Sequence, residues 1–361
     1  MLQAFDLFAG VGGLSLGLES AGFRIVAAVD ANRRHLAAYI ANHPHVPTEC
    51  MDVKQLKKSH GLIERLRDER IDLVAGGPPC QGFSYAGKQD VMDARNQLVK
   101  EFGRVVIAIR PRAFLMENVA GLLSPKYRML LDDFVSTLSR AGYSILPPLR
   151  VNAAEFGVPQ DRRRVFVLGY LSRVSPLLVD DLIATERNVH AATVRDAIFD
   201  LRRAFGKSRY AAPRHLARPS PYSARLRTDG RFPHFSPHRE PVGLSGCNST
   251  HHTRHVEKRF AALIPGEREP ISRFERLELY GLSPTLRAGT LPSHGSFMAP
   301  RPIHPISPRV ITVREAARLH SFPDWYEFDV TKWFSHMQIG NSVPPLVARA
   351  LGNVMRRILE A

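Results

Sequence analysis

The 361 residues suffice for one large domain or two smaller ones, and 44% hydrophobic with 23% charged residues is typical of a globular protein. No apolar run reaches the ~18 residues of a transmembrane helix, and three cysteines without a C-x-x-C pair argue against a disulfide framework. The net charge of +16 instead favours a polyanionic partner such as nucleic acid. The amino-terminal residues lack the pattern of a signal peptide, which predicts a cytoplasmic protein.

The first 170 residues alternate short apolar runs with amphipathic stretches, which predicts βαβ units around a mostly parallel sheet. Strands are expected at 4–8, 25–30, 71–75, 113–116 and 165–169, with a further candidate before Asp52. Helices are expected at 14–21, 32–42, 56–70, 97–109 and 127–141. Functional groups should gather where the parallel strands end.

From about residue 186 proline, arginine, serine and histidine become frequent, which predicts a loop-rich second domain. Residues 201–240 hold ten basic residues against two acidic ones, a concentration that suits a phosphate-facing surface. Order returns with a helix at 312–320, where Thr312 and Glu315 form a capping box, and with an amphipathic helix at 344–359.

A glycine-rich turn, DLFAGVGG, lies between the first expected strand and helix. Gly10 and Gly12 allow a ligand to approach the backbone, but Ser15 breaks the G-x-G-x-x-G pattern, so a pyrophosphate cofactor is not indicated. Asp30 closes the next apolar run and can accept both hydroxyls of a ribose, while Asp52 can receive an adenine amino group. A helix cap or a solvated carboxylate is the alternative for each acid.

The segment GGPPCQGFS follows the strand expected at 71–75. Two prolines stiffen this turn, and the flanking glycines let it fold tightly around Cys80. A cysteine presented in this way can react as a thiolate, whereas a structural cysteine would usually lie inside a strand or helix.

The blocks DLFAGVGG, GGPPCQGFS, MENV, QDRRRVF and QIGNSVPP, in this order, resemble the conserved blocks of the DNA (cytosine-5)-methyltransferase family. RVITVREAARLHSFPDW at 309–325 is similar to the block before the last. The resemblance implies a Rossmann-like, S-adenosylmethionine-dependent α/β domain with a mostly parallel sheet, plus a smaller loop-rich target-recognition domain. It assigns 1–185 to catalysis and cofactor binding, 186–331 to target recognition and 332–361 to a return into the catalytic domain.

The resemblance also implies a mechanism on a cytosine flipped out of double-stranded DNA. Cys80 would add to C6 and make C5 a carbon nucleophile toward the methyl donor. Glu117 would bind the N3 edge and the amine, with Asn118 holding its loop, while Arg162 and Arg164 would hold the nucleotide through O2 or phosphate. Loss of the C5 proton and β-elimination would then release the enzyme.

Family likeness further assigns the cofactor contacts and a lid. The lid would be the glycine-containing segment 81–96. Phe8 would pack on the adenine, and Gly10 and Gly12 would lie near the methionine portion. Asp30 would hold the ribose and Asp52 the adenine edge. The remaining contacts complete the expected set: Phe8, Gly10, Gly12, Asp30, Asp52, Pro78, Leu98, Asn341 and Ser342. The family usually has Glu at the position of Asp30, which is one methylene shorter.

The divergent part of the family, here about 170–305, would read the DNA sequence. Arginines such as Arg225 and Arg227 are candidates for guanine recognition. Cys247, with histidines at 251, 252 and 255, matches no standard zinc spacing, so no metal is predicted.

Three alternatives were weighed. An amino-methyltransferase would carry an acid or Asn before Pro-Pro and an aromatic after it, where this chain has Gly77 and Cys80. A tRNA cytosine-5 methyltransferase can share Pro-Pro-Cys, but the basic insertion favours duplex DNA. A catalytically silent DNA-binding protein should have lost Cys80, Glu117 or the arginines of the QDRRR block, and all of these are present. By analogy we expect a monomeric, nucleoid-associated prokaryotic modification enzyme with a separate companion restriction endonuclease.

Overall fold

The computed structural model describes residues 1–79, 97–171, 176–187, 192–204, 206, 209–211, 216–227, 244–289 and 301–361. The chain forms two compact units, the first made of Met1–Asn152, Arg163–Arg187 and Val347–Ala361, and the second of Ala153–Arg162 and Asn188–Leu346. These boundaries differ from those expected: residues 153–162 and 332–346 belong to the second unit. No helix in the described ranges is long and apolar enough to cross a membrane.

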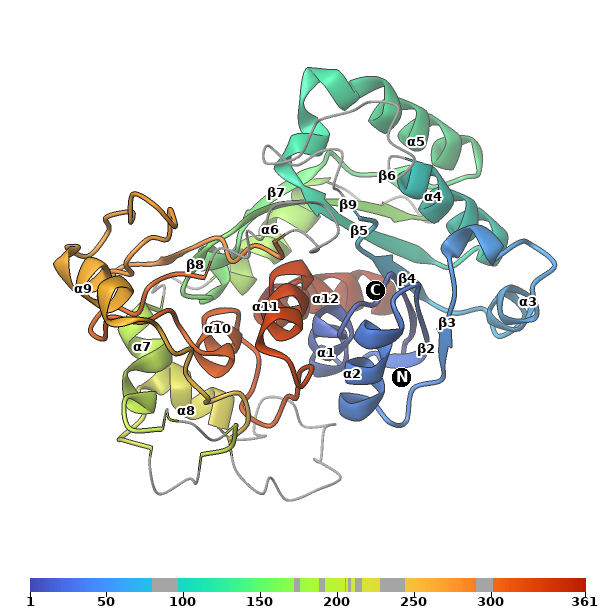
Figure 1. Cartoon of the computed structure of the whole chain (residues 1–361). Helices are drawn as coiled ribbons and strands as arrows, with labels where there is room; N and C mark the ends of the chain where they lie inside the picture. The colour runs from blue at the N-terminus through green and yellow to red at the C-terminus, as the bar shows by residue number, and fades with distance from the viewer. Residues whose placement is uncertain are drawn as a thin grey trace. The chain divides into compact units, whose positions relative to one another are not determined.

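The first unit is built on an eight-stranded sheet in the order β3-β2-β1-β4-β5-β9-β6, with β7 paired to β9 (Figure 1). Strands β1 to β5 are parallel, β9 runs antiparallel to β5, and β6 and β7 each pair antiparallel with β9. The strands are β1 (Gln3–Leu7), β2 (Arg24–Asp30), β3 (Thr48–Cys50), β4 (Leu73–Gly76), β5 (Ala113–Val119), β6 (Ser144–Ile145), β7 (Leu149–Asn152) and β9 (Arg163–Tyr170). The expected α/β class with a mostly parallel sheet is confirmed.

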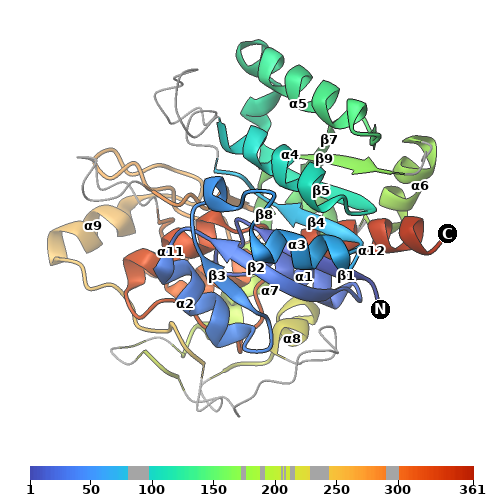
Figure 2. The same ribbon diagram turned by 90° about the vertical axis from the view of Figure 1, so that its right-hand side faces the viewer.

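Both faces of this sheet are buried, as near-continuous apolar strands require. On one face the rings of Phe102, Phe114 and Phe134 pack with centroids 6.0 to 6.4 Å apart, joining α4, β5 and α5 (Figure 2). On the other face α12 packs so closely on α1 that a Cβ at Gly352 would lie 2.7 Å from the Cβ of Ala21.

The helices of this unit mostly follow the sequence prediction, and the one expected at 97–109 has the same bounds in the structure. The helix expected at 56–70 is shorter, because His60 caps α3 by accepting the amide of Leu62 and a 3₁₀ turn precedes it. The helices are α1 (Gly13–Ser20), α2 (Arg33–Asn42), η1 (Val53–Gln55), α3 (Gly61–Asp68), α4 (Gln97–Ile109), η2 (Ala120–Leu123), η3 (Pro125–Tyr127), α5 (Arg128–Arg140), α6 (Pro176–Glu186) and α12 (Pro345–Glu360).

The second unit consists of short elements and loops. The predicted capping box is confirmed, because Thr312 accepts the amide of Glu315 while Glu315 accepts the amide of Thr312. Most of the other helices are too short for a clear hydrophobic period, which explains why they were not predicted. The elements are η4 (Ala153–Phe156), β8 (Gln160–Asp161), α7 (Val194–Ile198), η5 (Phe199–Leu201), α8 (Pro221–Arg227), α9 (Arg254–Ala262), β10 (Ser283–Pro284), α10 (Val313–Leu319) and α11 (Lys332–Asn341).

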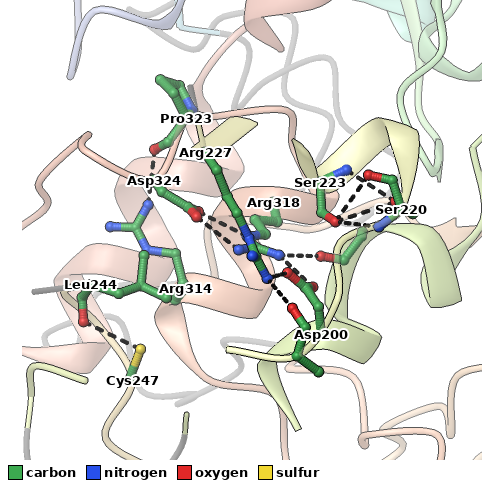
Figure 3. Close-up of polar contacts among 12 residues, drawn as sticks. Asp200, Ser220, Ser223, Arg227, Leu244, Cys247, Arg314, Arg318, Pro323 and Asp324 are labelled. Carbon is green, nitrogen blue, oxygen red and sulfur yellow. Dashed lines mark hydrogen bonds and ion pairs between the residues drawn. The ribbon is translucent and has the colours of Figure 1, made fainter. Parts of the chain in front are cut away.

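A buried ion-pair network accompanies the apolar side chains of this unit (Figure 3). Arg318, fully buried, pairs with Asp324 at 2.7 Å and with Asp200 at 2.6 Å. Arg227 also pairs with Asp200 and donates to the carbonyl of Ala217. Arg227 therefore helps hold α8 in the fold, and its expected role in reading guanine stays a prediction.

Candidate active site

The expected functional residues of the first unit lie where its parallel strands end. Phe8 and the glycine turn follow β1, Asp30 ends β2, Asp52 follows β3, Pro78 follows β4 and Glu117 lies near the end of β5. Strand order reverses between β1 and β4, which are hydrogen-bonded neighbours. Ligands of open α/β sheets bind at such a switch point.

The turn after β1 is left-handed at Phe8, Gly10 and Gly12, with φ of 66°, 58° and 97°. Asp30 holds this turn, because its Oδ2 accepts the amide of Gly10 at 2.9 Å and its Oδ1 accepts the amide of Asn32 at 2.7 Å. A Cβ at Gly10 would meet no described atom within 4 Å. The open backbone leaves room for the methionine portion of S-adenosylmethionine, so the turn fits that cofactor.

Apolar side chains lie in the segments next to these acids. Phe8, Met51 and Leu98 are partly buried and pack against one core cluster. Asp52 is exposed and caps the 3₁₀ helix η1 by accepting the amide of Lys54 at 3.0 Å. Phe8 and Leu98 are expected at the cofactor, and that role stays a prediction.

A further acid, Asp6, lies beneath the glycine turn and was not predicted from the sequence. Asp6 is fully buried, accepts the Ser15 hydroxyl at 2.6 Å, and Ser15 Oγ lies 2.8 Å from the hydroxyl of Tyr39. Its other oxygen has no partner among the described residues. Burial, with the nearby charges of Asp30 and Glu19, raises the pKa of Asp6 from 3.8 to about 7, although the Ser15 hydrogen bond opposes this.

Glu117 and Arg164 form an ion pair of 2.9 Å at the junction of β5 and β9. The antiparallel register places Glu117 opposite Phe166, so Arg164, two residues away, is its diagonal neighbour on the same face. Both side chains are about six-sevenths buried, with 14% and 15% exposed. Water therefore screens this carboxylate–guanidinium pair only partly.

The turn before Cys80 is attached to the same strand. Asn118, almost fully buried, donates its Nδ2 to the carbonyl of Pro78 at 3.4 Å. A Cβ at Gly77 would lie 3.0 Å from Oε2 of Glu117, so glycine allows the carboxylate to rest against the turn. Cys80 itself and the expected lid at 81–96 lie outside the described residues.

Arg162 occupies a different environment, within the second unit. Its guanidinium donates to the carbonyls of Leu286, Gly340 and Ser342 at 2.8 to 3.0 Å, and only 2% of the residue is exposed. The neighbouring Gln160 accepts the amide of Leu286 at 3.1 Å. The bonds of Arg162 to Gly340 and Ser342 join the QDRRR and QIGNSV blocks. Arg162 is thus bound to the backbone of its own unit, and the expected contact with the nucleotide stays a prediction.

Asn341 and Ser342 end α11 in the second unit. The carbonyl of Ser342 also receives Nε2 of His320 at 2.9 Å, and its hydroxyl donates to Gln338 at 2.8 Å. Their expected role at the cofactor stays a prediction.

The remaining cysteines differ in exposure. Cys50 is exposed, whereas Cys247 is buried and burial raises its pKa to about 11, so it remains a thiol at neutral pH. Within the described ranges no three histidine, cysteine or acidic side chains are grouped to hold a metal ion.

The fold, the left-handed glycine turn and the acid that closes β2 define a Rossmann-like methyltransferase. The family model for C-5 cytosine-specific DNA methylases matches residues 2–357, and the chain belongs to this family. It is a DNA (cytosine-5)-methyltransferase that uses S-adenosylmethionine.

Individual relatives are similar over most of their length. The type II methyltransferase M.XorII of Xanthomonas oryzae is 44% identical, over 98% of this chain and 84% of the relative. M.AgeI of Thalassovita gelatinovora is 30% identical over 98% and 99%. A solved E. coli prophage protein, provisionally described as a DNA modification methyltransferase, is 33% identical over the whole of both chains with a TM-score of 0.79. The Dnmt2 methyltransferase of S. pombe shares the fold at 17% identity and a TM-score of 0.64.

Replacing Asp6 by Asn should change how stability depends on pH. Because the folded-state pKa is raised to about 7, folded wild type binds more protons than the unfolded chain between pH 4 and 7, and its stability falls as pH rises through that window. From pH 5.5 to 7.0 wild type should lose about 1.5 kcal/mol relative to Asp6→Asn, measured by urea unfolding without cofactor. Parallel pH profiles of the two proteins would contradict the assignment.

Replacing Gly77 by Ala should displace the Glu117 carboxylate by a few tenths of an ångström, because the new methyl contacts Oε2. We expect kcat for methyl transfer to fall roughly ten- to hundredfold while cofactor affinity stays unchanged. The matched control is Gly61→Ala on α3, where a Cβ meets no described atom within 4 Å. Unaltered kcat in Gly77→Ala would show that the carboxylate position does not matter.

Proposed function

We propose that the protein methylates C5 of a cytosine flipped out of a short, specific sequence in double-stranded DNA, through a covalent bond between Cys80 and C6. The observation that carries this proposal is the Glu117–Arg164 pair, held against the turn that leads directly to Cys80. A carboxylate, a guanidinium and a thiol at one strand-end site match the needs of this chemistry.

In the first step the thiolate of Cys80 donates an electron pair to C6, and the C5–C6 π electrons shift into the ring. Glu117 hydrogen-bonds the N3 edge and the exocyclic amine, which favours protonation at N3 as the thiolate adds. Arg164, already paired with Glu117, has further donors for the cytosine O2. We assign Arg162 a positioning role, since its guanidinium is bound to backbone carbonyls.

S-adenosylmethionine supplies an electrophilic methyl group when bound. Phe8 and Leu98 would enclose the adenine side, Asp30 the ribose and Asp52 the adenine edge, with Gly10 at the methionine portion. After C5 is methylated, a base removes the C5 proton, and the electrons of that C–H bond form the C5–C6 double bond as the C6–S bond breaks. The electrons of the C6–S bond stay on the sulfur of Cys80, which regenerates the enzyme as a thiolate.

The biological setting is inferred from the relatives. M.XorII and M.AgeI are named type II methyltransferases, so we assign this chain to a restriction-modification system, with a separate companion endonuclease. We further propose that it acts as a monomer on nucleoid DNA in the cytoplasm.

Labelled S-adenosylmethionine and unmethylated plasmid DNA test the proposal, with sequencing to map 5-methylcytosine. We expect label at one short recurring sequence, none with Cys80→Ser, and a kcat about 10² to 10⁴-fold lower with Glu117→Gln. Both variants should still bind cofactor and duplex. Full methylation by Cys80→Ser would refute the covalent mechanism, and label on tRNA but not DNA would move the substrate to RNA.

A further inference from the structure

A cluster of basic side chains in the second unit has no role in the chemistry above. It consists of Arg301, Lys332, His252 and His336, and we call it the basic cluster. Lys332 opens α11, and His336 lies one turn later, so the two share a face of that helix. The carbonyl of Pro302, next to Arg301, accepts the amide of Ile311, and the preceding Val310 donates its amide to His252, so the segment of Arg301 and His252 meet on one stretch of chain. Each histidine also lies within the electrostatic influence of Arg301, Lys332 and one carboxylate, which is Glu257 for His252 and Glu315 for His336.

The cluster is fixed by bonds to neighbouring segments. The ammonium of Lys332 donates to the carbonyl of Ser249 at 2.7 Å, which ties the histidine-containing loop to α11. His252 accepts the amide of Val310 through Nε2 at 3.3 Å, so its Nδ1 carries the proton in the neutral ring. These two bonds fix the position of the loop that carries His252, and with it the Nδ1 donor of that ring.

The two permanent cations of this cluster lack an ion-pair partner within the described part of the chain. Arg309 and Arg318 in the same unit each bind a carboxylate through two nitrogens, at 2.7 to 2.8 Å. Arg301 and Lys332, both partly buried, form no ion pair with a described carboxylate. Burial lowers the pKa of each, and the charge of Arg301 lowers that of Lys332 further. Half-buried cations without a counter-charge cost free energy that a bound anion can offset.

Lys332 also lines a small hollow together with Arg209, Asn248 and Ser335. The acid of this hollow, Asp329, accepts the amide and the hydroxyl of Thr331, each at 2.8 Å. Thr331 therefore gives no side-chain cap to α11 in the described structure. Lys332 at the amino-terminal end of α11 adds its charge to the positive end of the helix dipole, which favours a negatively charged ligand.

We propose that Arg301 and Lys332 bind a backbone phosphate of the duplex DNA substrate. His252 stays neutral at physiological pH because burial lowers its pKa, so it can add a hydrogen bond without a third charge. A phosphodiester offers one negative charge and several oxygen acceptors, which matches two cations surrounded by neutral donors. The inference rests on the proposed function for its substrate, and it deepens that function by naming a sequence-independent contact.

Binding of a fluorescent duplex between 50 and 200 mM salt measures this contact. Removing one phosphate contact should make the slope of log K against log salt shallower by about 0.9 in Arg301→Gln and in Lys332→Gln. Over this fourfold range of salt, wild type should then lose about 3.5-fold more affinity than either variant. Arg301→Lys and Lys332→Arg keep the charge and should keep the wild-type slope.

Arg268→Gln is the matched control, because Arg268 is exposed and already paired with Glu275 at 3.2 Å. Its slope should equal that of wild type. Wild-type slopes in both Gln variants would overturn the inference, as would equal losses in the charge-conserving variants. Failure of wild type to bind duplex DNA at all would instead count against the proposed function.

Discussion

The contact between Glu117 and Arg164 depends on where one antiparallel strand joins a parallel sheet. β5 ends at the edge where the other parallel strands carry their functional groups, and β9 runs back along it in the opposite direction. This register brings the carboxylate and the guanidinium to 2.9 Å although they are 47 positions apart in the sequence. Asn118 on the same strand donates to the carbonyl of Pro78, so one strand positions both the acid and the turn that precedes Cys80 in the sequence.

Two arginines of the QDRRR block show that the type of a side chain does not determine which partner it binds. Arg164 faces a carboxylate, whereas Arg162, two positions earlier, donates to three backbone carbonyls of the second unit. A similar division applies to the excess charge of the chain. Arg227 and Arg318 neutralise Asp200 inside the fold, while Arg301 and Lys332 keep their charge uncompensated among the described residues. Net charge therefore predicts a polyanionic partner but not the residues that meet it.

Local patterns carried most of what the sequence predicted. The parallel strands, the helix at 97–109 and the capping box of Thr312 depend on neighbours within a few residues, and all three are confirmed. The roles of Arg162 and Arg227, and the buried Asp6, depend on partners brought together only by folding. Leu286, for example, lies 124 positions from Arg162. The strand expected at 165–169 is β9, but strands as short as the two residues of β6 have no period to detect, so β6 could not be predicted.

Incubation with duplex DNA in which 5-fluorocytosine replaces cytosine tests the central claim most directly. Fluorine at C5 blocks loss of the proton, so a bond between Cys80 and C6 cannot be released once the methyl group has been transferred. With S-adenosylmethionine present, the account predicts a protein–DNA adduct that survives denaturation and maps to Cys80, absent in Cys80→Ser. Methylation of ordinary DNA without any such adduct would contradict it.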